Sequence, residues 1–131
     1  MPEKILKRSE VPVEHTWNLA DIFETDELWL NEYESLKSIP EQIAAYRGKL
    51  GTNAKTLLDF FRFDDEVGVR LSMLYGYAHC KSDEDTANGK YQDFRGKAMN
   101  IYVEISGAAS FSTPEIMSIP EETINKFFEE E

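Results

Sequence analysis

Apolar side chains recur every three or four residues between positions 86 and 111, and this periodicity constrains the fold more than any other feature. The residues that share one face are Tyr91, Phe94, Ala98, Ile101, Tyr102, Ile105 and Ala109. A helix turns by about 100° per residue, so this spacing places these side chains on one stripe. A half-buried strand would need strict alternation, which no segment of the chain shows. The pattern therefore predicts an all-α protein.

Helical spacing also predicts a first long helix over roughly residues 25–48. Thr25 or Asp26 can open it, because a side-chain oxygen there can accept a hydrogen bond from the first turn. Pro40 removes one donor from the helical ladder, so we expect a kink or a restart at that point. The apolar stripe of this segment consists of Trp29, Tyr33, Leu36 and Ile43.

A second long helix is predicted over roughly residues 53–81, with Asn53 as its capping residue. Asp64 and Asp65 fall in its middle. Two interpretations fit these aspartates: they start a new helix after a short break, or they lie on the exposed face of one continuous helix.

Two further helices complete the pattern. The third is expected over roughly residues 86–111, with Asp85 or Thr86 as its cap. The fourth is expected over roughly 113–131, because the run from Ser112 to Glu115 places a hydroxyl and then a proline at a helix start. Within this range the run from Ile119 to Glu122 starts another helix, which includes Ile124, Phe127 and Phe128. Helices joined by short connectors predict an antiparallel bundle made of helical hairpins.

The first residues show no period. We expect residues 1–17 to form an extended lead-in and Asn18 to cap a short turn. Trp17, just before that cap, is predicted to pack onto a neighbouring helix. The whole chain, residues 1–131, fits a single domain by its length.

Three glycines lie on the third helix, on the side opposite its apolar stripe: Gly89, Gly96 and Gly107. Each costs about 1 kcal/mol of helix stability relative to alanine. One interpretation is that a second element packs closely against this line and makes the helix central. The other is that the line is an exposed face under little constraint.

Composition excludes several classes of partner. The formal net charge is -11, and the basic residues are scattered singly among acidic ones, which argues against nucleic acid and against an anionic membrane surface. Cys80 is the single cysteine, so an internal disulfide is impossible. The chain has neither a signal peptide nor an apolar run that could cross a bilayer, and this favours a cytoplasmic location.

Candidate catalytic residues are few. His15 and His79 are the two histidines, and neither belongs to an HExxH motif of the kind that holds a catalytic zinc. Cys80 adjoins His79, but neighbouring side chains on a helix diverge by about 100° and cannot form a catalytic dyad. We therefore expect that this segment contains no catalytic residue, no cofactor-binding residue and no metal ligand.

The remaining motifs also fail. The pairs Gly48-Lys49, Gly89-Lys90 and Gly96-Lys97 lack the other residues of a phosphate loop. The run from Asp83 to Asp85 resembles the start of a calcium loop, but Phe94 stands where the bidentate glutamate belongs. Asp64 and Asp65 diverge on a helix and are better explained as a solvated face.

Two stretches, taken in order, carry a family resemblance. The first is Arg8–Pro12, followed by Trp17–Phe23 and then by Trp29. The second is Tyr77–Thr86, followed by Ser110-Phe111 and then by Pro114–Ile116. Together they resemble the N-terminal region of the oligoendopeptidase F family, zinc metallopeptidases related to thimet oligopeptidase. The likeness preserves order and spacing from about Arg8 to the last residue.

The resemblance implies an all-α protein whose N-terminal helices form one wall of a deep substrate channel. In the family the zinc-binding HExxH and a downstream glutamate ligand lie in a later catalytic region, which this chain does not contain. The resemblance therefore places no catalytic residue, metal ligand or zinc in this segment. It implies zinc in the absent domain, with the remainder of the peptidase chain and short peptides as partners.

Two functional interpretations follow. In the first, the chain is the non-catalytic N-terminal segment of a zinc metalloendopeptidase, inactive alone, and it shapes the channel for short peptides. In the second, it is a stand-alone acidic helical module that binds a partner protein through an exposed helix face. Phe127 and Phe128 near an uncapped end favour the first. Self-association through exposed apolar surface is compatible with both, and an independent enzyme has little support.

Overall fold

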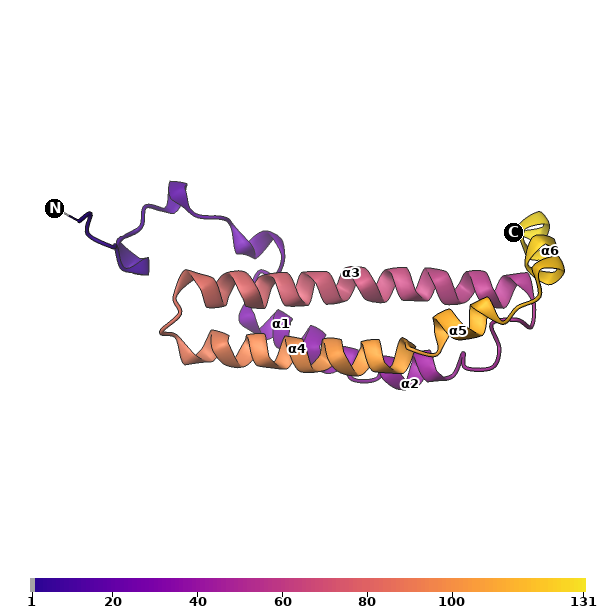
Figure 1. Cartoon of the computed structure of the whole chain (residues 1–131). Coiled ribbons are helices and arrows are strands. Elements are labelled where there is room, and N and C mark those ends of the chain that lie inside the picture. The colour runs from indigo at the N-terminus through magenta and orange to yellow at the C-terminus, as the bar shows by residue number, and fades with distance from the viewer. Residues whose placement is uncertain (1) are drawn as a thin grey trace.

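A long antiparallel hairpin forms the frame of the molecule in the computed structural model, which describes residues 2–131. Its arms are α3 (Ala54–Glu84) and α4 (Gly89–Ala109), and they lie side by side over most of their length (Figure 1). A short connector at residues 85–88 forms the tip of the hairpin. Among the described residues there is no strand, and the predicted all-α class is confirmed.

The first predicted helix is divided in two. Helix α1 (Asp26–Leu36) is followed by α2 (Ile39–Ala44), and both pack along the hairpin. Pro40 stands at the start of α2, as the restart prediction required. A proline in the first turn loses nothing, because the N–H that it lacks would have had no partner there.

Local capping chemistry was predicted correctly for two helices. The side chain of Thr25 accepts a hydrogen bond from the Leu28 amide, and that of Asn53 accepts one from the Thr56 amide. Helix α3 runs without interruption past Asp64 and Asp65, which are exposed. The interpretation of one continuous helix is therefore confirmed.

The start of α4 corrects a prediction. Neither Asp85 nor Thr86 caps this helix; Asn88 does, by accepting a hydrogen bond from the Lys90 amide. Asp85 instead accepts from the Ala87 amide within the connector. An Asx turn at the tip takes up the aspartate, so the helix begins three residues later than expected.

The glycine line also departs from the interpretation of close packing. Gly89, Gly96 and Gly107 are exposed, and a β-carbon built on any of them would meet no atom within 4 Å. Helix α4 instead contacts α1, α2 and α3 through its opposite, apolar side. Within residues 2–131 no element covers the glycines.

The lead-in is less extended than predicted. Within it lie two short 3-10 helices, η1 (Arg8–Glu10) and η2 (Val13–His15), and η3 (Leu19–Asp21) follows. Trp17 is 80% exposed, so its predicted packing onto a neighbouring helix is wrong. Met1 belongs to the predicted lead-in and lies outside the described residues.

The C-terminal part contains α5 (Ser112–Met117) and α6 (Glu121–Glu130), and α6 begins at the second helix start that the sequence predicts over 119–122. Ser112 donates to the Ala109 carbonyl instead of capping α5. Figure 1 shows both helices at the end of the hairpin that is remote from its tip. None of the helices in residues 2–131 has the length and apolar character needed to cross a bilayer.

Trp29 is the centre of the core. It is fully buried, and its indole Nε1 donates a 2.8 Å hydrogen bond to the Leu74 carbonyl of α3. Its ring stacks on Phe94 of α4 at 4.2 Å between centroids and on Tyr33 at 5.8 Å. One residue of α1 therefore joins both arms of the hairpin.

Candidate functional site

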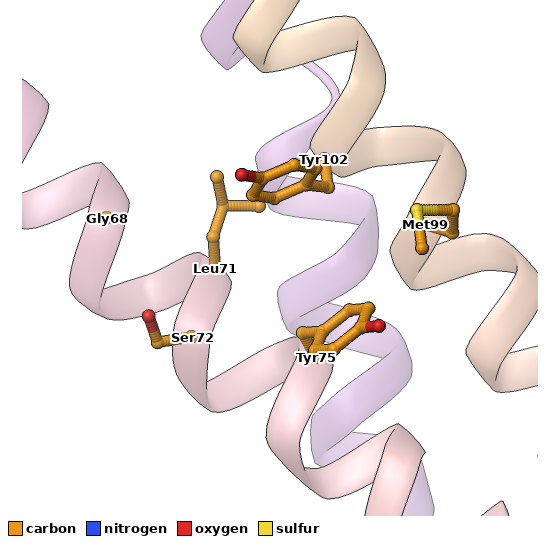
Figure 2. Close-up of a pocket in the computed structure, with 6 residues that line it drawn as sticks. All are labelled: Gly68, Leu71, Ser72, Tyr75, Met99 and Tyr102. Carbon is orange, nitrogen blue, oxygen red and sulfur yellow. The ribbon is translucent and has the colours of Figure 1, made fainter.

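A hollow lined by both helices lies between the two arms of the hairpin (Figure 2). We call it the hairpin groove. Its volume is about 480 Å³, and its lining consists of Gly68, Leu71, Ser72, Tyr75, Met99 and Tyr102. Apolar side chains and three hydroxyl groups share this lining, so the groove can accept apolar surface and still offer hydrogen bonds.

A line of polar groups along α3 holds one side of the groove. The Tyr75 hydroxyl is 2.8 Å from His79 Nε2, and His79 Nδ1 is 3.5 Å from Asp83 Oδ2. These residues are spaced four apart, which stacks them on one helix face. Arg95 of α4 lies 3.7 Å from the same Asp83 carboxylate and connects the line to the other arm. The arrangement fixes the Tyr75 ring at the groove wall.

A second polar cluster, which we call the tip cluster, lies near the hairpin tip around Asp26. One carboxylate oxygen accepts a 2.7 Å hydrogen bond from the Tyr77 hydroxyl. The other accepts a 2.9 Å bond from the Tyr91 hydroxyl and lies 2.6 Å from Lys90 Nζ. The ammonium of Lys81 lies over the rings of both tyrosines, at 5.6 and 5.5 Å from their centroids. The start of α1 is thereby tied to both arms.

These contacts shift the titration of the tip cluster. Partial burial raises the pKa of Asp26, but the hydrogen bonds from Lys90, Tyr77 and Tyr91 outweigh it and hold the pKa below its usual value. Burial, followed by the bond to Asp26, raises the pKa of Tyr77 and that of Tyr91. The bond to Asp26 raises the pKa of Lys90. The folded state therefore favours charged Asp26 and neutral tyrosines.

The residues weighed as metal ligands are not assembled into a metal site. His15 lines a shallow hollow that also contains Cys80, Asp83 and Glu84. Even so, the part of the chain that the structure describes contains no group of three His, Cys, Asp or Glu side chains able to hold an ion. The residues present thus do not fit a catalytic zinc. That this segment lacks catalytic residues stays a prediction.

Cys80 and His79 follow the geometry expected of helix neighbours. The two ring nitrogens of His79 face Tyr75 and Asp83, which leaves neither directed to the thiol. Cys80 is free and only partly buried.

Sequence reasoning missed the tip cluster and the hydroxyl of Tyr75. The sequence predicts for Asp26 only a position at a helix start, because its tyrosine partners lie 51 and 65 positions away in the chain. The i, i+4 spacing of Tyr75 and His79 was the one local signal for their contact.

Comparison with known proteins shows to which proteins this chain is related. Oligopeptidase PepF of Bacillus subtilis is 42% identical over 120 residues, which is 92% of this chain and 18% of that protein. The chain is a homologue of one part of oligoendopeptidase F. Chromosomal oligoendopeptidase F of Lactococcus lactis subsp. cremoris is 34% identical over 127 residues, 95% of this chain and 21% of the relative.

The structural comparison agrees. The crystal structure of oligoendopeptidase-F from Enterococcus faecium matches with a TM-score of 0.74 at 30% identity, over 82% of this chain and 21% of that one. No family model matches the chain. The resemblance to oligoendopeptidase F is therefore confirmed, and the chain spans about a fifth of the length of the curated relatives it matches.

Proposed function

We propose that this chain is the N-terminal, non-catalytic helical segment of an oligoendopeptidase F-like zinc metalloendopeptidase, and that it shapes the channel that admits short peptides. The observation that carries the proposal is the homology, which extends over 92% of the chain but only 18% of the B. subtilis relative. The zinc of such an enzyme would be held by polypeptide outside this segment.

The form of the segment supports a structural role. Helix α3 has 31 residues and α4 has 21, and the two are braced by Trp29 and the tip cluster. A braced pair of this length is about 30–45 Å long at 1.5 Å per residue, a scale suited to a channel wall. Its role would be to restrict entry to short peptides, in a cytoplasmic enzyme.

The experiment is a chimera. The aligned segment of B. subtilis oligopeptidase PepF is replaced by this chain, and cleavage of quenched peptides of increasing length is measured. We expect the chimera to cleave short peptides and to leave a folded protein intact. The 131-residue chain alone, with or without added Zn²⁺, is expected to cleave nothing.

Two results would reject the proposal. One is a folded chimera without activity. The other is peptide cleavage, or stoichiometric Zn²⁺ binding by calorimetry, in the chain alone. A stand-alone interaction module would instead leave the chimera inactive while the chain remains a stable monomer by light scattering.

A further inference from the structure

The exposed side of α4 beside the hairpin groove carries no charge along its second half. The exposed residues on this side are Met99, Tyr102, Val103, Ser106, Gly107 and Ser110. Asp93, Lys97 and Glu104 lie roughly 100° further round the axis. Arg95 lies on the same side as Met99, one turn nearer the tip, where its guanidinium is 3.7 Å from Asp83 and marks the end of the uncharged run. Because 30% of the residues of this chain are charged, an exposed strip without charge is unusual for a surface that contacts only water.

The facing side of α3 has the same character. Gly68, Ser72 and Tyr75 border the groove, and on this side of α3 no Asp, Glu, Lys or Arg lies between Asp65 and Asp83. Arg70 lies on another side of the helix, where its guanidinium Nε is 2.6 Å from Glu32. We call the two strips together the uncharged face (Gly68, Ser72 and Tyr75 of α3; Met99, Tyr102 and Val103 of α4). Figure 2 shows both tyrosine rings of this face between the two arms.

The uncharged face contains or adjoins three glycines, which add no side-chain bulk to it. Gly68 borders the groove, and Gly96 and Gly107 lie beside Val103; a β-carbon on any of them would meet no atom within 4 Å. Glycines in helices permit another backbone to approach closely, and they cost stability where nothing does so. Tyrosine and methionine beside them are residue types enriched at protein interfaces, where lysine and acidic residues are depleted.

The length of the relatives indicates what covers the uncharged face. This fold corresponds to 21% of the solved oligoendopeptidase-F chain, so about four-fifths of such a chain lies outside it. A segment joined to so much polypeptide needs a contact surface, and interfaces within one chain typically bury about 600–1,500 Å². We propose that the uncharged face is the surface on which the remaining, catalytic part of the peptidase packs. This inference rests on the proposed function.

The chain offers a matched pair of double substitutions for the test. Met99→Lys with Val103→Lys places two charges one turn apart on the uncharged face. Met73→Lys with Val69→Lys places the same charges at the same spacing on the side of α3 away from α4. Exposure is closely matched: 43% and 59% for Met99 and Val103, 41% and 61% for Met73 and Val69.

Both pairs are introduced into the 131-residue chain and into the PepF chimera. In the chain alone we expect both variants to keep their helical circular dichroism and thermal midpoint, because all four side chains already face water. In the chimera, the Met99/Val103 pair is expected to lower the thermal midpoint. It should also lower kcat/KM about tenfold or more for every peptide, because it buries charge without a partner. The Met73/Val69 pair is expected to stay within about twofold of the unsubstituted chimera.

Each other outcome overturns the inference. Equal effects of the two pairs would show that the face is not special. A rise in KM that depends on the peptide, with an unchanged thermal midpoint, would show that substrate occupies the face instead. Loss of a dimer of the chain alone, with a normal chimera, would assign the face to a second copy. An inactive chimera before any substitution would count against the proposed function itself, whereas an active chimera indifferent to Met99→Lys and Val103→Lys removes only this inference.

Discussion

The two ends of the hairpin are held together by different physics. At the tip, Asp26 joins Tyr77, Tyr91 and Lys90 through hydrogen bonds and charge. At the remote end, the contacts are mainly apolar and aromatic. The ring centroids of Tyr46 and Phe60 are 5.4 Å apart, and those of Phe60 and Phe111 are 6.2 Å apart. Phe127 lines a small hollow together with Leu57, Leu58 and Phe61.

This difference has a consequence for stability. Apolar packing is insensitive to protonation, whereas the tip cluster depends on the charge of one carboxylate. Acid should therefore weaken the tip more than the remote end, where apolar packing supplies most of the contacts. Substitutions at the two ends separate these contributions.

The largest effect is expected at the remote end. Phe60 is almost fully buried, and Phe60→Ala should lower the free energy of unfolding by about 3–5 kcal/mol through lost contacts and a cavity. Urea denaturation followed by circular dichroism measures this. Phe61→Ala, at the exposed neighbouring position, is the control and should cost less than half as much. Equal losses would contradict the packing described for Phe60.

At the tip, Asp26→Asn should lower the free energy of unfolding by about 1–3 kcal/mol at pH 7, because the charge that accepts from two tyrosines is lost. The pKa of Asp26 is lowered in the folded state, so its contribution is complete above the unfolded value of about 4 and is lost as the pH falls through the folded pKa.

Denaturation curves between pH 7 and pH 3 therefore distinguish the two ends. The native chain and Phe60→Ala should lose stability in parallel as the pH falls, whereas Asp26→Asn should show a flatter profile. The raised pKa values of Tyr77 and Lys90 predict a second loss as the pH rises above about 10. A profile of Asp26→Asn as steep as that of the native chain would assign the acid sensitivity to other carboxylates.

A carboxylate also secures the remote end, and its effect should be smaller. Glu115 of α5 accepts hydrogen bonds from the amides of Gly48 and Leu50. Gly48 has a φ of 78°, so the turn that presents these amides suits glycine. Glu115→Ala should cost about 1–2 kcal/mol, and Glu115→Gln should recover part of that loss by keeping an acceptor. Chemical denaturation of the pair is the measurement, and identical losses would argue against these bonds.

The smallest effect is a gain near the tip. The Ser82 hydroxyl is buried and has no hydrogen-bond partner among the described residues. Ser82→Ala should raise the free energy of unfolding by about 1 kcal/mol, since an unpaired buried hydroxyl is removed. Ser72→Ala, on the exposed side of the same helix, corrects for the higher helix propensity of alanine. A thermal midpoint no higher for Ser82→Ala than for Ser72→Ala would contradict this.

The candidate groove was only partly predictable from sequence. Tyr102 belongs to the apolar stripe of its helix by spacing, yet it is half exposed at the edge of the stripe and lines the groove. Tyr75 likewise falls among the apolar positions of α3 by its spacing from Leu71 and Leu74, yet it is only partly buried and lines the groove. The spacing of apolar residues locates the buried side of a helix only approximately. The neighbouring helix decides which residues at the edge of that side are covered.

What the sequence determined by itself was local or periodic. The all-α class, the caps at Thr25 and Asn53 and the restart at Pro40 depend on residues within a few positions of one another. The partners in such interactions are close in the chain, so sequence order alone brings them near one another.

Tertiary structure decided the rest. The exposure of Trp17, the open space above Gly96 and the contacts of Asp26 all depend on which helix lies alongside which. Asp26 and Tyr91 are 65 positions apart and meet only because Trp29 docks α1 against both arms of the hairpin. Contacts at that separation leave no local periodic signal, since folding rather than chain connectivity brings their partners together.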